Sequence, residues 1–90
     1  MQADHEKTLR LLKTARGQLD GIMRMVEDDR YCIDISTQIM ATSSILARVN
    51  ANVLKAHIKG CVRQAAESGS EEEKDEKLAE IEQVIDKLAR

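Results

Sequence analysis

The side chains best suited to chemistry in this chain of 90 residues are two cysteines and a histidine. His57 and Cys61 are four residues apart, so on a helix they leave the same face with Cβ atoms about 5–6 Å apart. A thiolate and an imidazole at that spacing suit one metal ion. Cys32 precedes His57 by 25 residues, a separation of nearly 40 Å along a continuous helix, so it cannot join them within one chain. Two such helices packed antiparallel would instead bring Cys32 of one subunit beside His57 and Cys61 of the other.

Two thiolates and one imidazole form a soft set of ligands that fits three-coordinate Cu(I), because zinc ordinarily takes a fourth ligand. The spacing alone leaves other interpretations open, since a buried cysteine is commonly a small core residue and a helical histidine commonly lies on the surface. His57 and Cys61 are also the pair found in thiol nucleophiles. The chain has no glycine-rich oxyanion loop, no orienting third residue and too little length for an enclosed pocket, so we expect no enzyme.

The elements that must position these residues are helices. The sequence has no Pro, four Gly and a single aromatic residue, Tyr31, while 33% of its residues are charged. A core of aliphatic and methionine side chains in so short a chain makes self-association the expected route to stability. No apolar run approaches the roughly 20 residues needed to cross a bilayer, and the N-terminus lacks an apolar secretory segment. We therefore expect a cytoplasmic protein without membrane contact, in which the cysteines stay reduced.

Apolar spacing and helix-end signals predict an all-α chain forming one domain, with helices over about 5–28, 32–67 and 71–89. The first helix carries an apolar stripe at intervals of three and four residues, made of Leu12, Ala15, Leu19, Ile22 and Val26. The cluster 28–30 separates the first two helices. Gly69 matches a left-handed C-cap, and Ser70 with Glu73 three residues later matches a capping box that starts the third helix.

The net charge of −2 is unevenly distributed along the chain. Residues 1–66 contain ten basic and seven acidic residues, whereas residues 67–90 contain four basic and nine acidic ones. The densest basic stretch lies within residues 7–24, where it forms either a solvated helix face or a surface for nucleic acid. No aromatic residue lies between the basic ones, so duplex DNA is favoured over single strands or RNA.

Three segments together resemble the CsoR/RcnR-type family of metal-sensing transcriptional repressors, and specifically its copper(I)-sensing branch. They are Arg16–Ile22 (RGQLDGI), Met25–Cys32 (MVEDDRYC) and the pair His57-x3-Cys61. The resemblance extends over almost the entire chain. It implies a three-helix protomer that forms an antiparallel helical-bundle dimer and then a disc-shaped dimer of dimers.

The same resemblance implies a mechanism and further residues. The metal-free homotetramer would bind double-stranded operator DNA, and Cu(I), with a copper chaperone as its donor, would bind between subunits at Cys32, His57 and Cys61. DNA would then be released and copper-resistance genes derepressed. Tyr31 and Glu72 resemble the pair that hydrogen-bonds the liganding histidine. The residues matched to DNA-contacting positions are Arg10, Lys13, Arg16 and Arg48.

Three alternatives stay open at this point. Cys32 and Cys61 could sense persulfide or polysulfide through a link between subunits. A nickel- or cobalt-sensing relative would need an additional N-terminal nitrogen ligand, and His5 does not match its position. In the third alternative, the chain is a structural helical module in which the cysteines only pack.

Overall fold

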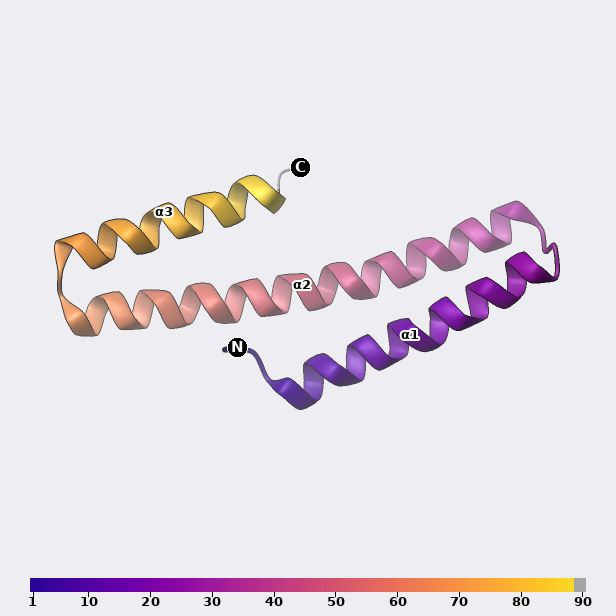
Figure 1. Cartoon of the computed structure of the whole chain (residues 1–90), viewed down its shortest axis with the longest axis horizontal. Coiled ribbons are helices and arrows are strands. Elements are labelled where there is room, and N and C mark those ends of the chain that lie inside the picture. The colour runs from indigo at the N-terminus through magenta and orange to yellow at the C-terminus, as the bar shows by residue number, and fades with distance from the viewer. Residues whose placement is uncertain (89–90) are drawn as a thin grey trace. The chain divides into compact units, whose positions relative to one another are not determined.

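The computed structural model describes residues 1–88, except for the side chains at positions 68 and 88, and within that range it contains three α-helices and no strand. Figure 1 shows α1 (His5–Glu27), α2 (Cys32–Ser68) and α3 (Glu71–Leu88) in chain order. The predicted all-α class and its three helices are therefore confirmed. Each bound differs by at most one residue from the predicted range, and the predicted helical residue at position 89 lies outside the described residues.

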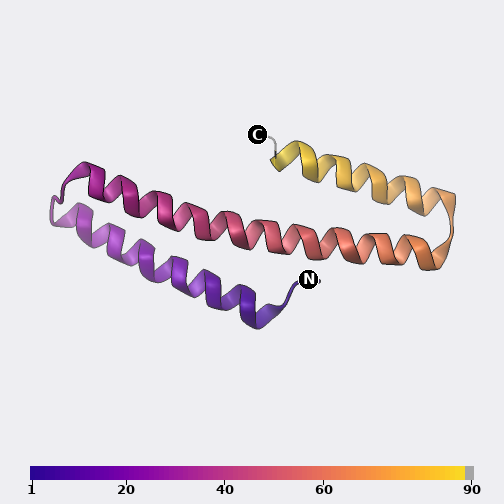
Figure 2. The same cartoon turned by 180° about the vertical axis from the view of Figure 1, so that it is seen from behind.

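The chain divides into two compact units. The N-terminal unit, Ala3–Asn52, contains α1 and the first part of α2. The C-terminal unit combines Met1–Gln2 with Val53–Arg90, and so contains the last part of α2 and α3. Opposite views in Figures 1 and 2 agree that within each unit the shorter helix runs back alongside its part of α2. Each unit is thus a helical hairpin.

Local backbone and side-chain bonds set both ends of α1. Asp4 is the N-cap, and its carboxylate accepts a hydrogen bond from the backbone N–H three residues later at 3.1 Å. At the other end the N–H groups of Asp29 and Arg30 donate to the carbonyl oxygens of Val26 and Met25 at 3.1 and 2.9 Å. These are the two bonds of a Schellman motif, with Asp29 in the left-handed conformation at φ 54°. The chain then turns, and α2 starts at the cysteine of the predicted metal site.

The buried core of the N-terminal unit is small. It consists of Ala15, Ile22, Thr42 and Val49. The Thr42 hydroxyl donates a hydrogen bond to Gln18 Oε1 at 2.9 Å, which links α2 to α1. The apolar stripe predicted for α1 is only partly covered, because Leu12, Leu19 and Val26 remain 38%, 52% and 59% exposed. One chain by itself therefore leaves part of its predicted apolar face in contact with water.

The turn between α2 and α3 follows the predicted helix-end signals. Gly69 has φ 69°, and its N–H donates to the carbonyl oxygen of Ala65 at 3.1 Å. The hydroxyl of Ser70 accepts a hydrogen bond from the N–H of Glu73 at 3.4 Å. The predicted C-cap glycine and serine N-cap are therefore confirmed, and this turn lets α3 fold back along α2.

None of the helices within residues 1–88 combines the length and the apolar character that a transmembrane helix needs.

Candidate metal centre

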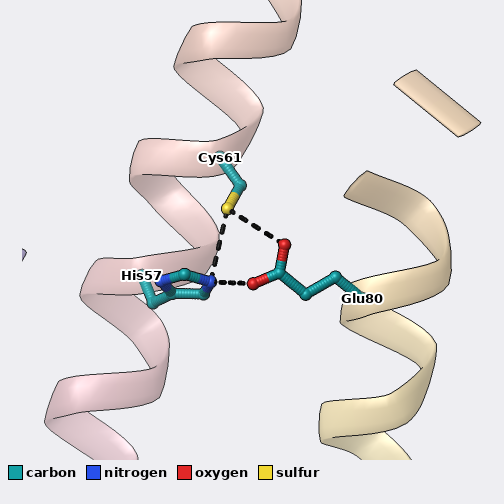
Figure 3. Close-up of side chains that lie close together, drawn as sticks. All are labelled: His57, Cys61 and Glu80. Atoms are coloured by element: carbon teal, nitrogen blue, oxygen red, sulfur yellow. Dashed lines mark hydrogen bonds and ion pairs between the residues drawn. The ribbon is translucent and has the colours of Figure 1, made fainter. Parts of the chain in front are cut away.

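Three side chains of the C-terminal unit meet at one point between α2 and α3 (Figure 3). Cys61 Sγ lies 3.4 Å from Nε2 of His57 and 4.0 Å from Oε2 of Glu80. The other carboxylate oxygen, Oε1 of Glu80, is hydrogen-bonded to the same Nε2. One ligand atom from each of the three residues thus lies within 4.8 Å of the other two.

The helices explain this convergence. His57 and Cys61 share one face of α2 because they are four residues apart. The turn at Gly69 reverses the chain, and in a helical hairpin residues at similar distances from the turn lie side by side. His57 precedes Gly69 by twelve residues and Glu80 follows it by eleven, so α3 presents Glu80 at the level of the histidine.

The site is buried on its sulfur side and open on its polar side. Cys61 is only 4% exposed, whereas the side chains of His57 and Glu80 are 43% and 39% exposed. Water and a small ion can therefore approach the imidazole and the carboxylate, while the sulfur is shielded from solvent. A thiol in this position is protected from bulky reagents and remains within reach of a metal ion.

The electrostatics of the site favour an ionised carboxylate. The hydrogen bond with His57 lowers the pKa of Glu80 most, and partial burial opposes it by raising that pKa. The charge of a protonated His57 and that of Lys77, whose Nζ lies 3.8 Å from Oε2, lower the pKa further. Next to a carboxylate anion the Nε2 of His57 carries a proton and donates it in the hydrogen bond. A negative oxygen is thus available where the imidazole and the thiol converge.

The geometry differs from that of a thiol nucleophile. In a Cys–His nucleophile the thiol bonds one ring nitrogen and an orienting group bonds the other. Here the sulfur of Cys61 and the carboxylate of Glu80 both face Nε2 of His57. The three residues instead offer sulfur, nitrogen and oxygen to a single point, which is an arrangement that suits cation binding.

Cys32, the third predicted ligand, lies elsewhere in the chain. It is the first residue of α2, belongs to the N-terminal unit and is exposed. The structure therefore brings His57 and Cys61 together without Cys32 of the same chain. This is the arrangement expected if Cys32 reaches the site from another subunit. Its place as a ligand stays a prediction.

No motif in the sequence singles out Glu80, and the family resemblance predicted Glu72 as the partner of His57. In this chain the carboxylate beside His57 belongs to Glu80, and Glu72 lies exposed in the first turn of α3. Glu72 follows Gly69 by only three residues, too close to the turn to be level with the histidine. Counting residues outward from the Gly69 turn is the signal that points to Glu80. Tyr31, just before α2, is 66% exposed, and its predicted role stays a prediction, as does that of Glu72 at a metal-loaded site.

The four basic residues predicted to contact DNA all belong to the N-terminal unit. They are Arg10, Lys13 and Arg16 on α1 and Arg48 on α2. All four are exposed, and within residues 1–88 none of them forms a salt bridge. Their charges therefore remain available to phosphate groups.

Comparison with known proteins gives one family and several close relatives. Residues 4–87 match the family described as "Metal-sensitive transcriptional repressor". The chain is 44% identical over 79 residues to the copper-sensing transcriptional repressor RicR of Mycobacterium tuberculosis (strain ATCC 25618 / H37Rv), covering 88% of this chain and 81% of that protein.

Two solved structures are similar over nearly the whole chain. The copper-sensing repressor CsoR with Cu(I) from Geobacillus thermodenitrificans NG80-2 has a TM-score of 0.80 and 40% identity, covering 94% of this chain and 85% of that one. The nickel-responsive transcriptional regulator InrS has a TM-score of 0.83 and 29% identity, covering 97% of this chain and 94% of that one.

Proposed function

Because the chain belongs to the metal-sensitive transcriptional repressor family, we propose that it is a cytoplasmic repressor that responds to Cu(I). In this proposal the metal-free protein binds double-stranded operator DNA, and Cu(I) binding releases the DNA and derepresses copper-resistance genes. The relatives named as copper-sensing repressors, RicR and CsoR, support the choice of metal.

The observation that carries the proposal is the pair of ligands already assembled on α2. Cys61 Sγ and His57 Nε2 are 3.4 Å apart, and a shared metal ion holds such ligand atoms at a similar separation. Cys32 of the partner subunit would complete the set, and its exposure at the start of α2 leaves it accessible to another chain. When bound, Cu(I) supplies a soft cation that prefers thiolates and accepts few ligands.

The proposal requires at least a dimer, and the N-terminal unit has a surface for one. An open groove between α1 and α2 is lined mainly by apolar side chains, among them Leu12, Leu19, Ile39 and Leu46, which are 38–52% exposed. Large apolar residues gathered in one groove are typical of a surface that another chain covers. A second copy seated there, and then a dimer of dimers, would bury this area.

The basic residues of the N-terminal unit would hold the DNA. These residues, Arg10, Lys13, Arg16 and Arg48, are exposed and form no ion pair among residues 1–88, so contacts with phosphate would break none of the ion pairs described there. Copper and DNA binding would then be coupled by a free energy of about 1–3 kcal/mol. DNA must weaken copper binding by the same factor by which copper weakens DNA binding. The bond between His57 and Glu80 uses the same Nε2 that Cu(I) would take, so copper binding would break this link between α2 and α3 and the change would reach a second helix.

An anaerobic Cu(I) titration of the metal-free protein, with and without duplex DNA, tests the proposal. We expect one Cu(I) per subunit, a thiolate-to-copper absorption band and release of the DNA. Cys32→Ala, His57→Ala and Cys61→Ala should each abolish release, while the matched control His5→Ala should behave as the parent. A Cys32→Ala protein that keeps the full response would refute the shared site.

Mixing variants tests the sharing between subunits directly. Cys32→Ala chains retain His57 and Cys61, and chains with both of those residues replaced retain Cys32. If one site takes ligands from two chains, mixing the two proteins restores one competent site per mixed dimer and part of the copper response. If neither the single proteins nor the mixture responds, the ligand set is wrong.

A second candidate function is a response to nickel, which the structural similarity to InrS favours. The identity to InrS is 29%, against 40% and 44% for CsoR and RicR. The same titration with Ni²⁺ separates the two, because only the physiological metal should release DNA at a stoichiometric amount. Persulfide sensing is separated by His57→Ala, which a sensor that relies on thiols alone would tolerate.

A further inference from the structure

We propose that His57, Cys61 and Glu80 form a second mode of metal binding, a site for Zn²⁺ contained within one chain. This inference rests on the proposed function in that it uses two of the copper ligands. It differs in the third ligand, because Glu80 takes the place of Cys32 and no partner subunit is needed. A divalent metal would therefore be bound by a different set of ligands from Cu(I).

The distances between the ligand atoms support zinc. Tetrahedral zinc with bonds of about 2.0–2.3 Å holds its ligand atoms about 3.3–3.6 Å apart. Cys61 Sγ lies 3.4 Å from His57 Nε2, within this range, and 4.0 Å from Glu80 Oε2, a few tenths of an ångström beyond it. The third pair, Glu80 Oε1 and His57 Nε2, is hydrogen-bonded, and a metal ion would replace the shared proton.

The proton balance of this replacement is simple. Zinc binding releases the thiol proton of Cys61 to solvent, because the metal binds the thiolate. Nε2 of His57 loses to solvent the proton that it shares with Glu80, and Nδ1 takes one up, so the ring stays neutral and binds the metal through Nε2. Glu80 binds as the carboxylate, and Lys77, whose Nζ lies 3.8 Å from Oε2, places a positive charge beside it.

The types of the ligand atoms separate the two metals. A carboxylate oxygen is a hard ligand that zinc accepts readily, whereas Cu(I) selects thiolates. In the part of the chain that the structure describes, no fourth His, Cys, Asp or Glu belongs to the group. The exposed sides of His57 and Glu80 leave room for water in that fourth position, as in zinc sites with three protein ligands.

A site of this kind has a regulatory consequence. Zinc would cross-link α2 to α3 within a single chain, and Cys32 would not be one of its ligands. It would compete with Cu(I) for His57 and Cys61 without assembling the intersubunit site that releases DNA. We therefore expect zinc to raise the concentration of copper needed for derepression and not to act as an inducer.

Competition titrations with a chromophoric zinc chelator test the proposal on the full chain. Glu80→Gln, which keeps the size of the side chain and removes its charge, should weaken Zn²⁺ binding about tenfold or more. Cys32→Ala should leave zinc affinity within about threefold of the parent, and so should the matched control Glu76→Gln, an exposed carboxylate on the same helix. Circular dichroism and a thermal melt of each variant show that it is folded.

Co²⁺ provides a second readout that does not depend on affinity. The parent and Cys32→Ala should show a sulfur-to-cobalt charge-transfer band with four-coordinate visible absorption, at one Co²⁺ per chain. In Glu80→Gln the visible bands should change shape, because a ligand has been exchanged. DNA binding of the zinc-loaded parent should match that of the metal-free protein.

The outcomes are distinct from those of the copper test. If Cys32→Ala weakens zinc as strongly as Glu80→Gln does, or if Glu80→Gln has no effect, the site within one chain is refuted while the copper response can stand. If Cys32→Ala retains both zinc binding and copper-dependent release, the zinc site stands and the intersubunit copper site is refuted. Release of DNA by stoichiometric Zn²⁺ would overturn the expected competition.

Discussion

The hydrogen bond between Thr42 and Gln18 gives a quantitative test of how α1 is held against α2. Thr42 is 8% exposed, and its hydroxyl lies 2.9 Å from Gln18 Oε1 and 3.1 Å from the carbonyl oxygen of Gln38 in its own helix. Thr42→Val keeps the shape of the side chain and replaces the hydroxyl with a methyl group. The bond to Gln18 is lost, while the carbonyl oxygen of Gln38 stays within the backbone hydrogen bonding of α2.

The magnitude follows from opposing effects. Losing the hydrogen bond costs about 0.5–1.5 kcal/mol. Burying a methyl group in place of the hydroxyl stabilises the folded state by up to about 0.8 kcal/mol. We therefore expect Thr42→Val alone to lower the free energy of unfolding by less than about 1 kcal/mol, so the single variant is a weak test.

A double-mutant cycle with Gln18→Met isolates the bond. If the two side chains interact as the structure shows, the effects of the substitutions should not be additive, and the coupling energy should be about 0.5–1.5 kcal/mol. Urea denaturation at one fixed protein concentration measures it, because association of subunits adds to apparent stability. Thr42→Ser, which keeps the hydroxyl, should retain the coupling. A coupling energy indistinguishable from zero would refute the interhelical bond.

Two further predictions concern the backbone of the N-terminal unit. Asp29→Gly should raise the free energy of unfolding by about 0.5–1 kcal/mol, because glycine adopts the left-handed φ of 54° without the strain of a Cβ; Asp29→Ala, which keeps the Cβ, should give no such gain in a thermal melt. Gly17→Ala should raise the free energy of unfolding by about 0.8–1.0 kcal/mol, since an added Cβ meets no atom of the described residues within 4 Å. A loss of stability in urea denaturation would contradict this and would show that another chain packs against Gly17.

Much of the local structure was predictable because its causes lie within one or two turns of helix. Gly69 and Ser70 act through bonds to residues three or four positions away, and they set the end of α2 and the start of α3. The spacing of His57 and Cys61 places both on one face of α2 in any fold that keeps this helix. The apolar stripe of α1 could also be recognised from its spacing. How much of it is exposed could not, because that depends on which other helices cover it.

The sequence by itself therefore determined three helices, their ends and one pair of candidate ligands, because backbone hydrogen bonds and helical periodicity act over a few residues. Only the tertiary structure decided which carboxylate meets His57. Several glutamates lie on α3, and the choice of Glu80 over Glu72 depends on how far each is from the Gly69 turn and on how α3 packs against α2. The count from Gly69 selects the level along α3, but which side chain at that level faces His57 is set by how α3 packs against α2, and no pattern within a few residues specifies that packing.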